Sequence, residues 1–276
     1  MPAAPGGRVV SHIHIPDGVL PVWLWVIGWM LTLVAVRVAS SVAKRADVRR
    51  KVPLLGVVAA LVLVSMSSEI VPIAYHINLT VVAGVLLGPA LSVIAAFIIE
   101  IVLALLGHGG VTVIGLNTLM IGGEMVLGWA LFRLFLRLLG PRRIRWSAGV
   151  ATVLTLAITT TALVGIVALA GGGAATGRET GALDPASLTF KNPFGAGIFS
   201  VNTLRGEVGS AVPADTGLSV GRFAAVVYTL APIGWLIEAL VTAATLGYVA
   251  RVRPGLLSAG ALGATRVSPA GDEGAH

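Results

Sequence analysis

The apolar residues of the chain fall into long runs separated by short polar or glycine-rich stretches. A membrane-spanning helix needs ~20 consecutive, mostly apolar residues. One run is shorter than this and ends at Gly88 and Pro89, where a helix is expected to break. Seven runs follow the pattern, at residues 19–42, 53–71, 77–87, 90–106, 113–139, 146–170 and 223–250. The pattern predicts an all-α polytopic membrane protein with about seven transmembrane helices.

The basic residues between the runs predict how these helices are oriented. Six Lys or Arg lie within residues 37–51 and five within 133–145, whereas residues 71–78 and 107–116 contain none. Loops rich in Lys and Arg stay on the cytoplasmic side of a membrane. We therefore expect the N-terminus outside and the C-terminus in the cytoplasm.

This orientation also predicts the domain organisation. Residues 1–253 are expected to form a single transmembrane domain, with an extracytoplasmic loop at about 171–222 that lies over the outer face. Residues 254–276 are polar and rich in small residues, which predicts a disordered cytoplasmic tail.

Composition supports the membrane assignment and excludes several kinds of chemistry. Hydrophobic residues make up 56% of the chain and charged residues 11%, whereas a soluble domain carries about 25% charged residues. The chain has no cysteine, which rules out disulfides, thiolate ligands and iron–sulfur clusters. No phosphate-binding GxxxxGK[ST] loop and no His-Glu-x-x-His motif occur. ATP hydrolysis by such a loop and zincin-type catalysis are therefore excluded.

Four of the five histidines, His12, His14, His76 and His108, fall on the predicted outer face. In an extended segment, His12 and His14 would point to the same side. Imidazole is the commonest protein ligand for nickel, copper and zinc. The alternative is that these histidines are incidental loop residues. Their shared side of the membrane favours a metal site over that alternative.

Three ordered motifs resemble one family. HIPDG at residues 14–18 resembles the N-terminal signature of the CbiM/NikM proteins, the substrate-binding membrane subunits (S components) of energy-coupling factor (ECF) transporters for cobalt and nickel. HINL at 76–79, followed by LGP at 87–89, resembles the family's second histidine and the helices after it. LGHGGVTVIGLN at 106–117 resembles its glycine-rich block. The resemblance is best over residues 12–135.

The resemblance implies a square-planar site near the outer face, in which His14 and His76 are the imidazole ligands. The family's remaining donors are the backbone nitrogen of the first histidine and a free N-terminal amine. Here twelve residues precede Ile13, which occupies the position of the family's initiator methionine. Either the His12 imidazole replaces the amine, or the mature chain begins at Ile13. Both possibilities remain open.

Several further residues are candidates for supporting roles. Asp17 orients His14 or simply caps a turn, and His108 is an auxiliary ligand or an ordinary loop residue. Asn117 matches the family block and is expected to hydrogen-bond a ligand or loop backbone, unless it makes an ordinary interhelical contact. Glu69 lies near the outer face, shortly before His76.

Two other groups of residues lie within the predicted helices. Glu100, Glu124 and Glu238 are scattered along the chain, which favours packing or interfacial positions over a proton relay. Ala35, Ala39 and Ala43 recur every four residues. The resemblance implies that this alanine face docks on the coupling membrane subunit, and internal packing is the alternative.

Together these observations predict a multi-pass protein of a prokaryotic plasma membrane that is not an enzyme. The expected substrate is Co²⁺ or Ni²⁺, used for cobalamin synthesis or for nickel metalloenzymes. The resemblance implies two cytoplasmic ABC ATPases and a coupling membrane subunit as partners, sometimes with a small accessory membrane subunit, and no nucleic acid. The alternatives are a gradient-driven permease that uses the intramembrane glutamates and a membrane-embedded metalloenzyme.

Overall fold

The computed structural model describes residues 21–45, 51–67, 77–106, 110–179 and 220–261, and every regular element in these ranges is helical. Helices enclose their own backbone hydrogen bonds, as a chain of this hydropathy requires inside a bilayer. The elements are α1 (Val22–Arg45), α2 (Val52–Ser67), α3 (Thr80–Leu87), α4 (Pro89–Leu105), α5 (Ile114–Leu139), the short η2 (Pro141–Arg143), α6 (Ile144–Glu179), α7 (Val220–Val252) and α8 (Pro254–Ala261).

Four segments of the described chain are long and apolar enough to cross a membrane. They are Val22–Ala43, Ile114–Leu139, Pro141–Ile166 and Val227–Val252. Two shorter apolar helices, Val52–Met66 and Pro89–Leu105, accompany them. The predicted all-helical membrane fold is therefore confirmed. Four of the seven predicted spans meet this requirement of length and apolar composition in the described residues.

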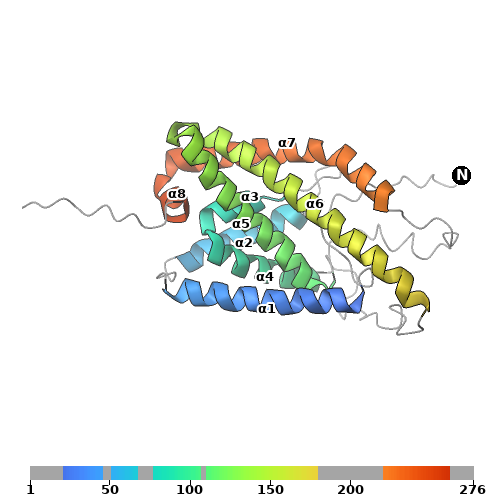
Figure 1. The fold of residues 1–276 in the computed structure, drawn as a ribbon. Helices are drawn as coiled ribbons and strands as arrows, with labels where there is room; N and C mark the ends of the chain where they lie inside the picture. The colour runs from blue at the N-terminus through green and yellow to red at the C-terminus, as the bar shows by residue number, and fades with distance from the viewer. Residues whose placement is uncertain (1–20, 46–50, 68–76, 107–109, 180–219, 262–276) are drawn as a thin grey trace, which may run out of the picture.

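The helices form a bundle with α1 along one side and α6 and α7 along the other, as Figure 1 shows. Helices α2, α3, α4 and α5 lie between these sides, and α5 contacts α1, α3, α4 and α6. Helix α8 follows the end of α7 and packs against α3. The centre of the bundle is therefore filled by helices.

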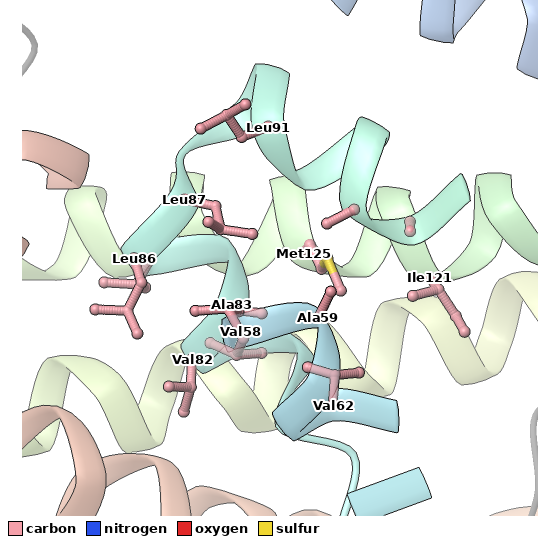
Figure 2. Close-up of a cluster of buried hydrophobic side chains, with 14 of the residues drawn as sticks. Val58, Ala59, Val62, Val82, Ala83, Leu86, Leu87, Leu91, Ile121 and Met125 are labelled. Carbon is pink, nitrogen blue, oxygen red and sulfur yellow. The ribbon is translucent and has the colours of Figure 1, made fainter. Parts of the chain in front are cut away.

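Helix α3 is the centre of this bundle. All eight of its residues are buried, because its sequence TVVAGVLL is apolar on every side after Thr80, and such a helix has no face for water or lipid headgroups. A Cβ atom added at Gly84 would lie 2.0 Å from the backbone oxygen of Met125 on α5. Only glycine allows this approach. Figure 2 shows Met125 and Ile121 of α5 beside the buried side chains of α2 and α3.

A single residue separates α3 from α4. Gly88 has φ 76° and ψ 171°, a conformation that side-chain-bearing residues avoid. Pro89 then occupies the first turn of α4, where its missing N–H has no consequence. The predicted break at Gly88 and Pro89 is confirmed.

Two predicted boundaries were wrong. Helix α6 continues to Glu179, so residues 171–179 of the predicted 171–222 loop are helical. Residues 254–261 form α8 rather than a disordered tail. Pro254 begins this helix, and the buried Leu257 joins the core beside α3, which supplies the packing that composition alone did not reveal. The remainder of both segments lies outside the described residues.

Candidate functional site

Most of the predicted metal-site residues lie outside the described part of the chain. These are His12, His14, Asp17, Glu69, His76 and His108. Their assignment as ligands or supporting groups therefore stays a prediction. Among the residues that the structure describes, no three His, Cys, Asp or Glu side chains gather as a metal site.

A buried polar cluster lies directly after His76 in the chain. The side-chain amide of Asn78 donates a hydrogen bond of 2.7 Å to Oε1 of Glu124 on α5, and the hydroxyl of Thr80 donates to the same oxygen. The hydroxyl of Thr159 on α6 donates to Oε2 of Glu124 over 3.1 Å. Glu124 is only 2% exposed. A carboxylate removed from solvent requires such donors.

Asn78 also connects this cluster to α7. Its backbone N–H donates to Oε1 of Glu238, which is likewise 2% exposed. The two carboxylates therefore reach one residue from two different helices. Asn78 lies two positions after His76, so the chain that follows this predicted ligand is held by α5 and α7 together.

The polar cluster lies at one consistent depth in the bundle. Glu124 precedes the end of α5 by fifteen residues, and Thr159 follows the start of α6 by fifteen. At 1.5 Å per residue both are about 22 Å from the helix ends that carry the basic residues. A hydrocarbon core is about 30 Å thick. Measured from the helix ends that carry Arg137 and Arg145, both residues therefore lie past the midpoint of a core of this thickness.

The backbone between the two donors of this cluster is strained. Leu79, between Asn78 and Thr80, has φ 50° and ψ 11°. This left-handed conformation costs roughly 1–2 kcal/mol for a residue with a side chain. The hydrogen bonds of the neighbouring Asn78 and Thr80 fix the backbone on both sides of Leu79. A strained conformation persists only where the surrounding contacts hold it in this way.

A second polar contact lies where α1 crosses the glycine-rich block. The indole N–H of Trp29 donates to the backbone oxygen of Thr112 over 2.8 Å, and the hydroxyl of Thr32 donates to that of Gly115 over 2.6 Å. A Cβ atom at Gly115 would lie 2.6 Å from the backbone nitrogen of Trp29. The helix that follows HIPDG in the chain is thus fixed to the block that follows His108.

Asn117 lies in this block and is 2% exposed. Its backbone N–H donates to the oxygen of Val113 over 2.9 Å, within the first turn of α5. The structure therefore places Asn117 inside the bundle near the α1 crossing. Its predicted role toward a ligand stays a prediction.

The alanines of the first helix lie mainly inside the bundle. Ala39 and Ala43 are buried and Ala35 is partly buried, because α1 packs against α4 and α5. The exposed positions of α1 are instead large and aliphatic, such as Met30 and Val34. These positions support the internal-packing alternative for the alanine repeat.

Sequence reasoning did not bring Glu124 and Glu238 together. It treated each glutamate as an isolated packing or interfacial residue, and Glu100 on α4 is indeed buried without joining the cluster through any of the hydrogen bonds above. A usable signal was present. Glu124 and Glu238 lie at nearly equal distances before the basic ends of α5 and α7, and helices that end at one face place such residues at one depth.

The fold and the buried polar cluster define a polytopic helical membrane protein in which polar groups are enclosed by apolar helices. The family described as "CbiM: Cobalt uptake substrate-specific transmembrane region" matches residues 14–256. The chain belongs to this family, and metal-uptake transport across a membrane is the function of its class. The match begins at His14, the first residue of HIPDG.

Two relatives and one solved structure are similar to this chain. The "Putative cobalt transport protein CbiM" of Halobacterium salinarum is 31% identical over 175 residues, covering 59% of this chain and 77% of that protein. A "Putative metal transport protein" of Haloquadratum walsbyi is 35% identical over 128 residues, covering 45% and 59%. The "Crystal Structure of an Truncated Transition metal Transporter" has a TM-score of 0.62 at 16% identity, over 86% of this chain and 98% of that one. This last likeness shows a shared fold.

Proposed function

We propose that the chain captures Co²⁺ or Ni²⁺ at the outer face of a prokaryotic plasma membrane and delivers it inward as the S component of an ECF-type importer. In this proposal the bundle has seven spans, including the short α3 region, with the N-terminus outside and the C-terminus in the cytoplasm. Residues 107–116 contain no Lys or Arg, whereas residues 133–145 contain five, which supports this orientation.

The observation that carries the proposal is the position of the polar cluster. Ionisable groups inside a membrane are unfavourable and mark substrate or ion pathways. Glu124 and Glu238 both bond to Asn78, the residue that follows the His76-Ile77 pair. A predicted metal ligand therefore lies two positions in the chain before a residue at which buried polar groups of α3, α5, α6 and α7 meet.

The proposed ligands are His14 and His76, completed by the backbone nitrogen of His14. The fourth donor is the imidazole of His12 in the full-length chain, or the free amine in a chain that begins at Ile13. Nitrogen donors in a plane suit Ni²⁺, and Co²⁺ is the alternative substrate. Asp17 and His108 are proposed as supporting groups.

The energy for uptake is proposed to come from partners, since the sequence contains no GxxxxGK[ST] loop. The partners are a coupling membrane subunit, two cytoplasmic ABC ATPases and, in some assemblies, a small accessory membrane subunit. The alanine repeat contributes little of the docking surface in this proposal, because Ala39 and Ala43 are buried within the chain.

Calorimetry on the purified full-length protein tests the capture step. The parent should bind Ni²⁺ or Co²⁺, and His14→Ala and His76→Ala should each abolish high-affinity binding. Lys44→Ala, a charge change at the basic end of α1, is the control and should bind as the parent does. Unchanged affinity in either histidine variant would remove that histidine from the site.

A second function is favoured by the same cluster. Two buried carboxylates joined through one asparagine are also what a proton-coupled permease requires. Metal uptake into cells that lack the ATPase and coupling subunits separates the two functions. ECF transport predicts no uptake in such cells, whereas a gradient-driven permease predicts uptake that stops when the proton gradient is collapsed.

A further inference from the structure

A groove of about 740 Å³ opens where η2 and the start of α6 meet the last turns of α7. Four arginines line it, together with the indole of Trp146 and the backbone at Gly247: Arg142, Arg143, Arg145 and Arg251. This groove lies at the first turns of α6 and the last turns of α7, away from Thr159 and Glu238 of the polar cluster. The proposed capture function does not use it.

The four guanidinium groups lie together without compensating charge in the described chain. All four arginines are exposed, and no described Asp or Glu forms a salt bridge with any of them. Four like charges around one hollow repel each other and attract an anion. The acidic residues of α5 and α7 lie elsewhere, at Glu124 and Glu238 in the polar cluster, and the acidic residue of α6 is Glu179, at the opposite end of that helix.

The floor of the groove is shaped for an arginine side chain. A Cβ atom at Gly247 would lie 2.6 Å from Nε and 2.8 Å from Cγ of Arg145. The missing side chain therefore lets the stem of Arg145 lie against the backbone of α7. The guanidinium group of Arg145 therefore lies beside α7, and Arg251 of α7 lines the same groove.

An exposed apolar stripe begins at the edge of the groove. Trp146, Val150, Leu154 and Ile158 are all exposed and recur every four residues along α6. This spacing places them on one face of the helix. From Trp146 to Ile158 the stripe extends about 18 Å, comparable with a lipid acyl chain. Trp146 itself is 72% exposed, as expected for a residue at the membrane interface.

We propose that this groove binds the phosphate headgroup of an anionic phospholipid whose acyl chains lie along the α6 stripe. Guanidinium groups bind phosphate oxygens in a bidentate manner. Basic pockets between transmembrane helices on the cytoplasmic side recognise headgroups such as that of cardiolipin. Four arginines suit a lipid with two phosphates, and the adjoining stripe favours a lipid over a free anion or an acidic protein segment.

The test compares lipid binding by charge-matched variants of the full chain in neutral detergent. Cardiolipin, phosphatidylglycerol, phosphatidylcholine and inorganic phosphate are each titrated, while the melting temperature and the lipid retained in native mass spectrometry are measured. The groove variant is Arg143→Gln with Arg251→Gln. The control is Arg37→Gln with Arg137→Gln, which removes the same charge from exposed arginines outside the groove.

We expect cardiolipin to stabilise the parent and the control more than phosphatidylcholine does, and the groove variant to lose ~10-fold or more in apparent affinity, as removal of charged hydrogen bonds implies. Arg143→Lys with Arg251→Lys should retain intermediate affinity. Equal cardiolipin affinity in the groove variant and the control would overturn the proposal. Equal affinity of the parent protein for cardiolipin and phosphatidylcholine would also overturn the proposal. This comparison uses the parent alone and does not depend on whether a variant folds.

Two further outcomes would assign the groove to another ligand. Stabilisation of the parent by inorganic phosphate at the affinity of cardiolipin would show a site for free phosphate and overturn the lipid assignment. Unchanged lipid binding in the groove variant, with loss of co-purifying transporter subunits, would show a protein-docking surface instead. Both outcomes are distinct from any result on Ni²⁺ or Co²⁺ binding.

Discussion

The side-chain amide of Asn78 and the carboxylate of Glu124 are joined by a hydrogen bond of 2.7 Å across the centre of the bundle. The bond connects the entrance of α3, the innermost helix, with the middle of α5. It matters because the same asparagine donates its backbone N–H to Glu238. One residue therefore fixes the relative positions of α3, α5 and α7, and its loss would leave two buried carboxylates short of donors.

Thr159→Val should lower the stability of the folded protein by about 1–3 kcal/mol, because the isosteric side chain cannot donate to Oε2 of Glu124 and a hydrogen bond to a buried charged group is lost. Thr229→Val on α7 is the matched control, since Thr229 is exposed and its hydroxyl donates to the backbone oxygen of Ala225 in its own helix. Thermal unfolding in detergent measures both. Similar melting temperatures for the two variants would show that Thr159 contributes nothing to Glu124.

Gly84→Ala should strongly reduce the yield of folded protein. Its Cβ would lie 2.0 Å from the backbone oxygen of Met125, and backbone atoms of two packed helices cannot move apart without opening the core. Gly123→Ala on α5 is the control, because nothing lies within 4 Å of its added Cβ. That variant should be neutral or stabilised by about 0.5–1 kcal/mol. Size-exclusion profiles of the two variants decide between these expectations, and a folded, stable Gly84→Ala protein would contradict the close α3–α5 contact.

Trp29→Phe should weaken the α1 crossing, because the indole N–H to the oxygen of Thr112 is removed while the aromatic ring is largely kept. The loss of one such hydrogen bond costs about 1 kcal/mol. Trp23→Phe, at an exposed position of the same helix, should leave stability unchanged. If the crossing also positions the N-terminal segment for metal capture, Trp29→Phe should reduce Ni²⁺ affinity several-fold in calorimetry and Trp23→Phe should not. Equal Ni²⁺ affinities of the Trp29→Phe and Trp23→Phe variants would show that the crossing does not influence the metal site.

His12→Ala should weaken metal binding ~10–100-fold in a chain whose N-terminus is intact, since a donor would be replaced by water. In a chain that starts at Ile13 the free amine would supply the missing donor, and binding should be as tight as in the parent. Mass spectrometry of the purified protein establishes which N-terminus is present before calorimetry. Parent-like affinity of intact His12→Ala would contradict ligation by His12.

The helical membrane fold was predictable because long apolar runs have few alternatives in a bilayer. The break at Gly88 and Pro89 was equally predictable, since both residues act locally on the backbone. The boundaries that failed depended on contacts far away in sequence. Helix α8 forms where Leu257 packs beside α3, and periodicity within the tail could not reveal that partner.

The family motifs were visible in the sequence, and the family match begins at His14, but the buried polar cluster was not predictable. HIPDG and His76 could be recognised as residue patterns. The bonds from Asn78 and Thr80 to Glu124, and from Asn78 to Glu238, join residues 46, 44 and 160 positions apart, respectively. No local spacing rule covers such separations. The alanine repeat illustrates the same limit, because its periodicity identifies a face of α1 and not what covers it.

The single-residue link at Gly88 constrains how the chain enters the membrane during synthesis. Helix α3 has eight residues, about 12 Å of helix, and is too short for the insertion machinery to recognise alone. It can therefore take its place only together with its neighbours, and the one-residue link at Gly88 ties it to α4. The order of biogenesis follows from this: α3 can take its central place only after α4 has been made, and Asn78 can meet Glu124 and Glu238 only once α5 and then α7 have left the ribosome.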